Sequence, residues 1–179
     1  MCSSDLAAKD AGAIVVSGDS QGQYHEVEIK QGKILTGAKV HELILESDVF
    51  INVPVLKHHG GADLTIGMKN HIGIIWDRRV WHLSDLHQCI ADFATFKKPE
   101  LTVVDAFNVM MKNGPRGGTI EDLANMKSLI VTVDPVAADS AGAKLFGIEP
   151  ESVGYIKLAK QLNVGETDLS KLAIKKINI

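Results

Sequence analysis

Apolar and polar residues alternate along the chain in blocks that predict strands and helices in succession. Residues 49–56 form a short apolar run rich in β-branched residues, which predicts a buried strand. Apolar residues recur at helical spacing over residues 84–96, which predicts the strongest helix. Further strands are predicted at residues 13–16, 24–30, 101–104, 129–133 and 172–179. Further helices are predicted at residues 5–12, 40–46, 64–75, 135–146 and 151–162.

Strands that alternate with helices of this length indicate an α/β fold. We expect a mostly parallel sheet with helices on both faces. The 179 residues, 45% of them hydrophobic, are enough for one domain with a real core, so we expect a single domain over residues 1–179.

Composition argues against several classes of protein. The net charge is −3 and aromatic residues make up 5%, so the chain lacks the footprint of a nucleic-acid binder. No apolar run approaches the roughly 18 residues of a membrane span, and no signal peptide is evident, so we expect a cytoplasmic protein with no membrane partner. Cys2 and Cys89 are too few to ligate an iron–sulfur cluster without another chain. The sequence identifies no cofactor.

The strand at residues 49–56 leads into a basic, glycine-rich segment, Lys57-His58-His59-Gly60-Gly61. A strand that opens into such a segment is where α/β sheets place ligand chemistry. We expect Lys57, and Lys69 in the next predicted helix, to bind or polarise a substrate. His58 or His59 would move a proton. The alternative for both lysines is an ordinary solvated position.

Two aspartates follow predicted strands, and we expect both to take part in catalysis. Asp105 follows residues 101–104, and Asp134 follows residues 129–133. If all the strands are parallel, their ends meet at one edge of the sheet, where the carboxylates would orient Lys57 and the histidines. The alternatives are that Asp105 simply ends a strand and that Asp134, before Pro135, only caps a helix.

Other polar residues are predicted to bind the ligand. The loop at residues 113–118 could hold an anion through its backbone N–H groups and Arg116, although tight turns of this composition are common. A metal site built from His58 or His59 with Asp105 or Asp134 stays an alternative, because no standard metal motif is present. The predicted ligand-binding residues are Asn70, Gly114, Arg116, Gly117 and Asp139.

Several segments in order resemble the domain of unknown function 362 family. They are residues 48–59, residues 65–73 with Met68-Lys69-Asn70, residues 86–92, Val103-Val104-Asp105-Ala106, Asn113-Gly114-Pro115, Asp134 to Asp139, and residues 147–155. The resemblance covers roughly residues 5–165. It implies an uncharacterised, redox-associated protein whose relatives are often joined to an iron–sulfur module. It also implies that the chain matches the later part of the family domain and lacks an N-terminal strand.

Three functions follow as hypotheses. The first is a binding or catalytic domain for a small anionic metabolite at the carboxyl ends of the strands. The second is a scaffold subunit that docks an iron–sulfur redox partner. The third is a metal-binding domain that uses histidine and aspartate. A sheet that lacks a strand leaves an open edge, which favours a homo-oligomer.

Overall fold

The computed structural model of this chain describes residues 3–178, and a mixed sheet lies at its centre. β6 runs parallel to β3 and β4 and antiparallel to β7, and β5 pairs antiparallel with β4. A smaller antiparallel sheet joins β1 to β2. The strands are β1 (Tyr24–Glu28), β2 (Gly37–His41), β3 (Ile51–Asn52), β4 (Val55–His59), β5 (Asp63–Thr65), β6 (Leu101–Met110) and β7 (Leu123–Thr132).

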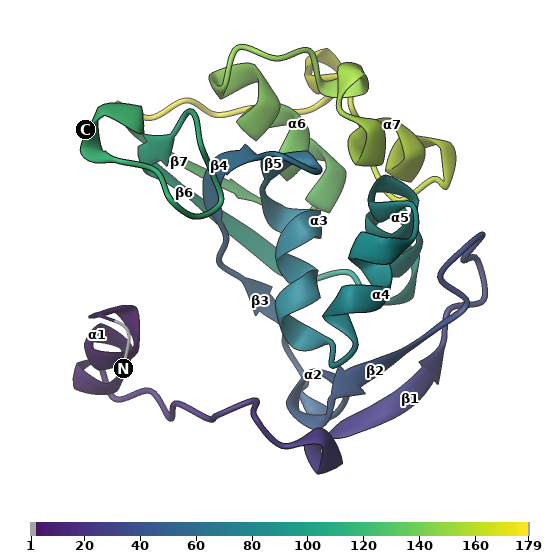
Figure 1. Cartoon of the computed structure of the whole chain (residues 1–179). Coiled ribbons are helices and arrows are strands. Elements are labelled where there is room, and N and C mark those ends of the chain that lie inside the picture. The colour runs from purple at the N-terminus through teal and green to yellow at the C-terminus, as the bar shows by residue number, and fades with distance from the viewer. Residues whose placement is uncertain (1–2, 179) are drawn as a thin grey trace.

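The helices of the chain's second half gather beside this sheet (Figure 1). α6 packs on β6 and β7, and it also contacts α3 and α7. The α-helices are α1 (Ser3–Asp10), α2 (Glu42–Glu46), α3 (Gly67–Asn70), α4 (Arg78–Leu83), α5 (Leu86–Phe96), α6 (Pro135–Leu145) and α7 (Gly154–Gln161). Single 3₁₀ turns are η1 (Gln21–Gln23), η2 (His71–Ile74), η3 (Ile120–Asp122), η4 (Pro150–Ser152) and η5 (Leu169–Lys171).

The predicted strand at residues 49–56 is divided by Pro54 into β3 and β4. Proline has no N–H to donate to a ladder, so pairing stops there, although the carbonyl of Pro54 still accepts the N–H of Asp105 at 2.8 Å. β4 then continues through Lys57, His58 and His59, which were expected in a loop. They are held in strand conformation because β5 turns back and pairs with them.

The α/β class is confirmed, and the hydrophobic core lies between the sheet and the helices. α5 presents an apolar face that includes the fully buried Ile90 and Phe93, and the fully buried Leu56 comes from β4. The structure confirms the helix start predicted at Asp134-Pro135, and it begins the helix predicted over residues 84–96 at Leu86. Asp85 accepts the N–H of Gln88 at the start of α5, and Asp134 accepts two N–H groups at the start of α6.

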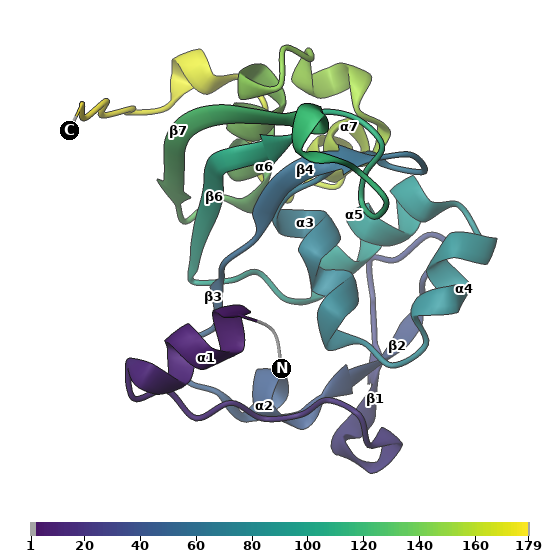
Figure 2. The same cartoon turned by 60° about the vertical axis from the view of Figure 1, so that its left-hand side comes forward.

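The two faces of the sheet differ in what covers them. Helices α3, α5, α6 and α7 lie on one side of β4, β6 and β7 (Figures 1 and 2). The other face, which we expected helices to cover, exposes seven large apolar side chains, and we call it the open face. They are Ile51, Val53, Val55, Phe107, Leu129, Val131 and Val133.

Two predicted strands do not form in the described part of the chain. Residues 13–16 pair with no strand, and Ile14 is 91% exposed; residues 172–178 also lie outside any strand. β propensity alone does not make a strand, because strand stability comes from cross-strand pairing and packing. β6 is longer than predicted, so Asp105 lies within the strand and not after it.

Candidate functional site

Five basic side chains gather at the carboxyl end of β4, and we call them the basic cluster. Lys57, His58 and His59 come from β4 itself. Lys69 comes from α3, and His82 comes from α4. The cluster therefore joins the sheet to two helices of the covered face.

Lys69 is held in place by the way α3 begins. The carboxylate of Asp139, fully buried in α6, accepts the N–H of Gly67 at 2.8 Å and that of Met68 at 3.2 Å. These N–H groups are the unpaired donors of the first helical turn, so Asp139 caps α3 from outside it. A Cβ atom at Gly67 would lie 2.8 Å from the Asp139 carboxylate, so the close approach needs glycine there. The position of Lys69 is thus set by two contacts that do not involve its own side chain.

The amine of Lys69 is in an unusual environment for a lysine. The residue is only 4% exposed. Burial, and then the nearby charge of Lys57, lower its pKa from 10.5 to about 8. Within the part of the chain that the structure describes, neither Lys57 nor Lys69 forms an ion pair or a side-chain hydrogen bond. A buried cation without a partner is costly, so Lys69 is a candidate for contact with a ligand.

Both histidines of β4 accept a backbone N–H at Nδ1. Gly114 donates to His58 at 3.1 Å, and Gly61 donates to His59 at 3.1 Å. Nδ1 of His58 also lies 3.3 Å from the carbonyl oxygen of Gly114, but the N–H of Gly114 is nearer. In each neutral ring we therefore assign the proton to Nε2, which becomes a donor. Neither Nε2 atom has a hydrogen-bond partner among residues 3–178. The unused groups of the two imidazoles are N–H donors, as are those of the two lysines.

His59 and His82 stack with their ring centres 6.1 Å apart. Burial, followed by the charges of Lys69, His82 and His58, lowers the pKa of His59 to about 4. Burial and then Lys69 also lower the pKa of His82. The His59 ring is therefore neutral near pH 7 and available as a hydrogen-bond donor.

The two aspartates predicted to join the lysines lie elsewhere. β7 runs antiparallel to β6, so Asp134 lies beside the start of β6, whereas Lys57 pairs near its end. About 25 Å of strand separates these two ends. Asp134 instead caps α6 and also accepts the N–H of Glu166. The expectation that Asp134 shares an edge with Lys57 is wrong, because it assumed that every strand was parallel.

Asp105 lies on the open face in the middle of β6. It pairs in register with Val55 and Leu129, and its Oδ1 accepts the N–H of Phe107 at 2.9 Å. It forms no ion pair with Lys57. The predicted contact between this carboxylate and the lysines is therefore wrong in the observed arrangement.

The predicted ligand-binding residues are divided between several places. Gly114 contacts His58, so its loop does reach the basic cluster. Arg116 and Gly117 lie further along that loop and are exposed, and Gly117 has a positive φ of 91°. Asn70, the last residue of α3, donates to Oδ1 of Asn52 in β3 at 2.8 Å. Asp139 caps α3, as described above.

The sequence analysis missed two polar residues near the site. His82 was interpreted as a structural residue, because nothing in the local pattern links α4 to β4. Asn52 is buried at the end of β3, where it donates to Gly67 at 2.8 Å. A polar residue inside an apolar strand is the signal that could have identified Asn52, since such groups need buried partners.

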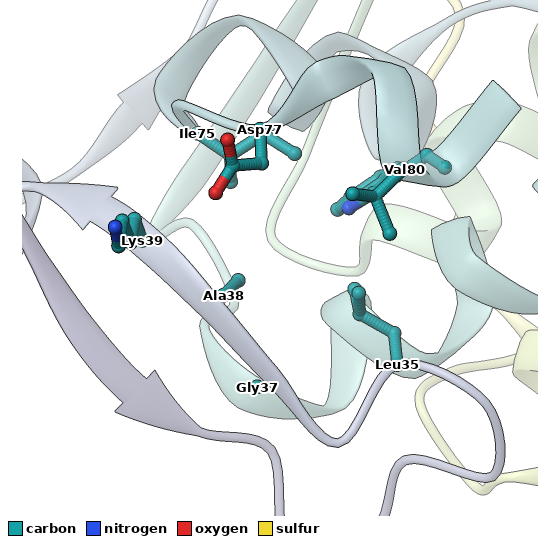
Figure 3. Close-up of a pocket in the computed structure, with 8 residues that line it drawn as sticks. Leu35, Gly37, Ala38, Lys39, Ile75, Asp77 and Val80 are labelled. Atoms are coloured by element: carbon teal, nitrogen blue, oxygen red, sulfur yellow. The ribbon is translucent and has the colours of Figure 1, made fainter. Parts of the chain in front are cut away.

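Two cavities at the surface of the described chain lie away from the basic cluster. One cavity of about 100 Å³ lies between β2 and α4, with Lys39 and Asp77 on facing walls (Figure 3). Another, of about 420 Å³, lies beside Lys144 and Glu149. In residues 3–178, no group of three or more His, Cys, Asp or Glu side chains is placed to hold a metal ion. The basic cluster is thus a set of donors at the end of a strand, with Lys69 buried and the three β4 residues partly exposed.

None of the described helices has the length and hydrophobicity needed to cross a bilayer. A comparison with known proteins finds a relative in Synechocystis sp., the thylakoid-associated protein sll1697. It is 23% identical over 155 residues, which cover 79% of this chain and 47% of the relative. The chain therefore spans about half the length of this relative. No solved structure is significantly similar to the chain.

The family comparison covers most of the basic cluster's surroundings. Residues 3–144 match the family described as Domain of unknown function (DUF362). This match takes in β4, α3, α4 and the loop that carries Gly114. It confirms the family expected from the sequence motifs: the chain belongs to the DUF362 family.

Proposed function

We propose that this chain binds a small anionic metabolite, one that carries a carboxylate or a phosphate, at the basic cluster. The observation that carries the proposal is the chemistry of the unused groups: two lysine amines and two Nε2–H groups are all donors. None of them is paired within residues 3–178. An anion supplies the negative charge and the acceptors that this set lacks.

Lys57 and Lys69 would provide most of the attraction. Because Lys69 is buried and repelled by Lys57, the free protein holds two like charges together at a cost in free energy. A bound anion attracts both ammonium groups, and this attraction offsets their repulsion. The same anion would raise the pKa of Lys69, so binding above about pH 8 would be accompanied by proton uptake.

His58 or His59 would orient the anion and exchange a proton with it, since neighbouring residues of a strand point to opposite faces. Their Nδ1 atoms are held by backbone N–H groups, so each ring presents Nε2 in a fixed direction. Such preorganised donors suit either binding alone or a proton transfer within a reaction. The arrangement favours an anion over a divalent cation, because two ammonium groups repel a metal ion.

The experiment is a ligand titration of purified protein at constant ionic strength. Inorganic phosphate and oxalate are the probes, and calorimetry and the thermal midpoint are the readouts. We expect wild-type protein to bind at least one probe, and Lys57→Met and Lys69→Met to weaken that binding. Lys157→Met is the matched control, since Lys157 is exposed on α7, away from the cluster. Equal responses in wild type and both cluster variants would contradict the proposal.

A further inference from the structure

The open face is an apolar surface formed by neighbouring strands: β3 and β4 lie on one side of β6, and β7 lies on the other. Residues 51, 53 and 55 alternate outward along β3 and β4, with buried residues between them. β6 pairs Leu101 with Ile51 and Asp105 with Val55, and β7 pairs Val131 with Val103. The register thus places the residues of this face in rows across strands that lie side by side, and Figure 2 shows these strands.

This face is too apolar to be an ordinary solvent-exposed sheet surface. The outward positions of a one-sided sheet are normally polar. Here seven large apolar residues on one face are each more than 40% exposed, from Val55 at 43% to Val133 at 72%. A contiguous apolar surface of this kind marks an interaction site.

Two charged residues on these strands lack a partner of opposite charge. Asp105 lies among Val55, Val103 and Leu129 and accepts only the N–H of Phe107. Lys127 is exposed on β7, two residues before Leu129. Neither forms an ion pair within residues 3–178. The face therefore carries one negative and one positive charge, close together, in apolar surroundings.

We propose that the open face binds a second copy of this chain. An isologous contact brings a surface against itself across a two-fold axis. An axis that passes between Asp105 and Lys127 places each aspartate opposite the partner copy's lysine, so both charges are paired as the apolar rows pack. Sheets that pack face to face lie about 10 Å apart, which these side chains can fill.

The first test measures molecular mass in solution over a range of concentrations by sedimentation or light scattering. We expect the wild-type chain to be dimeric at about 100 µM, where even a weak dimer is populated. Leu129→Glu places a charge in the middle of the face and should give a folded monomer. Leu83→Glu is the matched control, because Leu83 is 74% exposed on α4 and should leave the dimer intact.

The second test distinguishes a second copy from any other partner. Asp105→Lys and Lys127→Asp each bring like charges together in a homodimer, so each variant alone should be monomeric. A mixture of the two variants restores both oppositely charged pairs and should form a heterodimer. Circular dichroism confirms that each variant is folded.

Three results would overturn the proposal. They are a wild-type chain that stays monomeric at every concentration, a Leu129→Glu variant that dimerises like the wild type, and two charge variants that do not associate when mixed. Phosphate binding to the basic cluster should be the same in Leu129→Glu as in the wild type, since that residue lies on the opposite face.

Discussion

The buried and partly buried carboxylates of this fold differ from the amines of the basic cluster in whether they have hydrogen-bond partners. Asp92 accepts three backbone N–H groups, Asp134 accepts three and Asp139 accepts two. Lys57 and Lys69, in contrast, have no partner within residues 3–178. These three carboxylates hold loops and helix starts in place, whereas the two lysine amines are available to a ligand.

This difference shows which polar residues stabilise the fold and which are candidates for function. A carboxylate that accepts several N–H groups is fully used by its own chain, since each bond satisfies an otherwise unpaired donor. A buried ammonium group without a partner lowers stability, so its presence calls for another explanation. A bound anion is the explanation that we propose.

The largest expected effect comes from removing one of the carboxylates that accept backbone N–H groups. Asp139→Ala leaves the N–H groups of Gly67 and Met68 buried without an acceptor, and it should lower the free energy of unfolding by about 3 kcal/mol. Urea denaturation measures this loss. Asp139→Asn keeps one acceptor oxygen and should lose less. A change within experimental error in Asp139→Ala would show that this carboxylate is not needed to cap α3.

The Lys69→Met variant tests whether the unpaired lysine binds an anion and lowers stability. It should weaken phosphate or oxalate binding at least tenfold, because a charge-assisted hydrogen bond contributes about 1.5–3 kcal/mol. Its free energy of unfolding should be equal to or higher than that of the wild type, since an unpaired buried charge is removed. Calorimetry and urea denaturation give the two values. A Lys69→Met variant that is less stable than the wild type, yet binds phosphate or oxalate equally well, would contradict the proposed role of Lys69.

The dependence of anion affinity on pH tests whether Lys69 is the group that binds the anion. Because its pKa is lowered to about 8, the amine loses its charge above that pH, and affinity for sulfate should fall as pH rises from 7 to 10. Sulfate is chosen because its own charge is constant over this range. Lys69→Met should bind weakly and with a flatter pH profile. A wild-type affinity that is constant up to pH 10 would argue against Lys69 as the binding group.

The lowered pKa of Lys69 also determines the direction in which the stability of the folded chain changes with pH. Between about pH 8 and pH 10.5 the unfolded chain holds a proton on residue 69 that the folded chain has released. Stability therefore rises with pH across this window, and the Lys69→Met variant should lack that contribution.

The smallest expected effect concerns the imidazoles. His59→Phe removes one neutral donor and should weaken anion binding about fivefold, in line with about 1 kcal/mol for a hydrogen bond. His82→Phe keeps an aromatic ring beside His59 and should change binding about twofold or less. Titration calorimetry at pH 7 separates the two. If His82→Phe loses more anion affinity than His59→Phe, the anion lies closer to α4 than we propose.

Local sequence patterns predicted much of the fold where neighbouring residues determine the structure. The helical spacing of residues 84–96 and the Asp134-Pro135 pair predicted α5 and the start of α6, because periodicity and capping are local properties. The basic residues of β4 were found because they follow an apolar run directly. These features need no knowledge of distant contacts.

Features that depend on pairing partners were not predictable in the same way. Residues 13–16 have the composition of a strand but no partner in the described chain, so they do not form one. The direction of β7 decides where Asp134 lies, and an apolar run carries no information about direction. His82 reaches His59 only through the packing of α4, which no local pattern shows.

The most direct test of the central claim is a crystal structure of the protein soaked in selenate, with anomalous diffraction from selenium. We predict a selenium peak between Lys57 and Lys69, with selenate oxygens at hydrogen-bonding distance, about 2.7–3.0 Å, from both amines. A crystal in which exposed lysines such as Lys157 hold selenate while Lys57 and Lys69 remain without it would contradict the account.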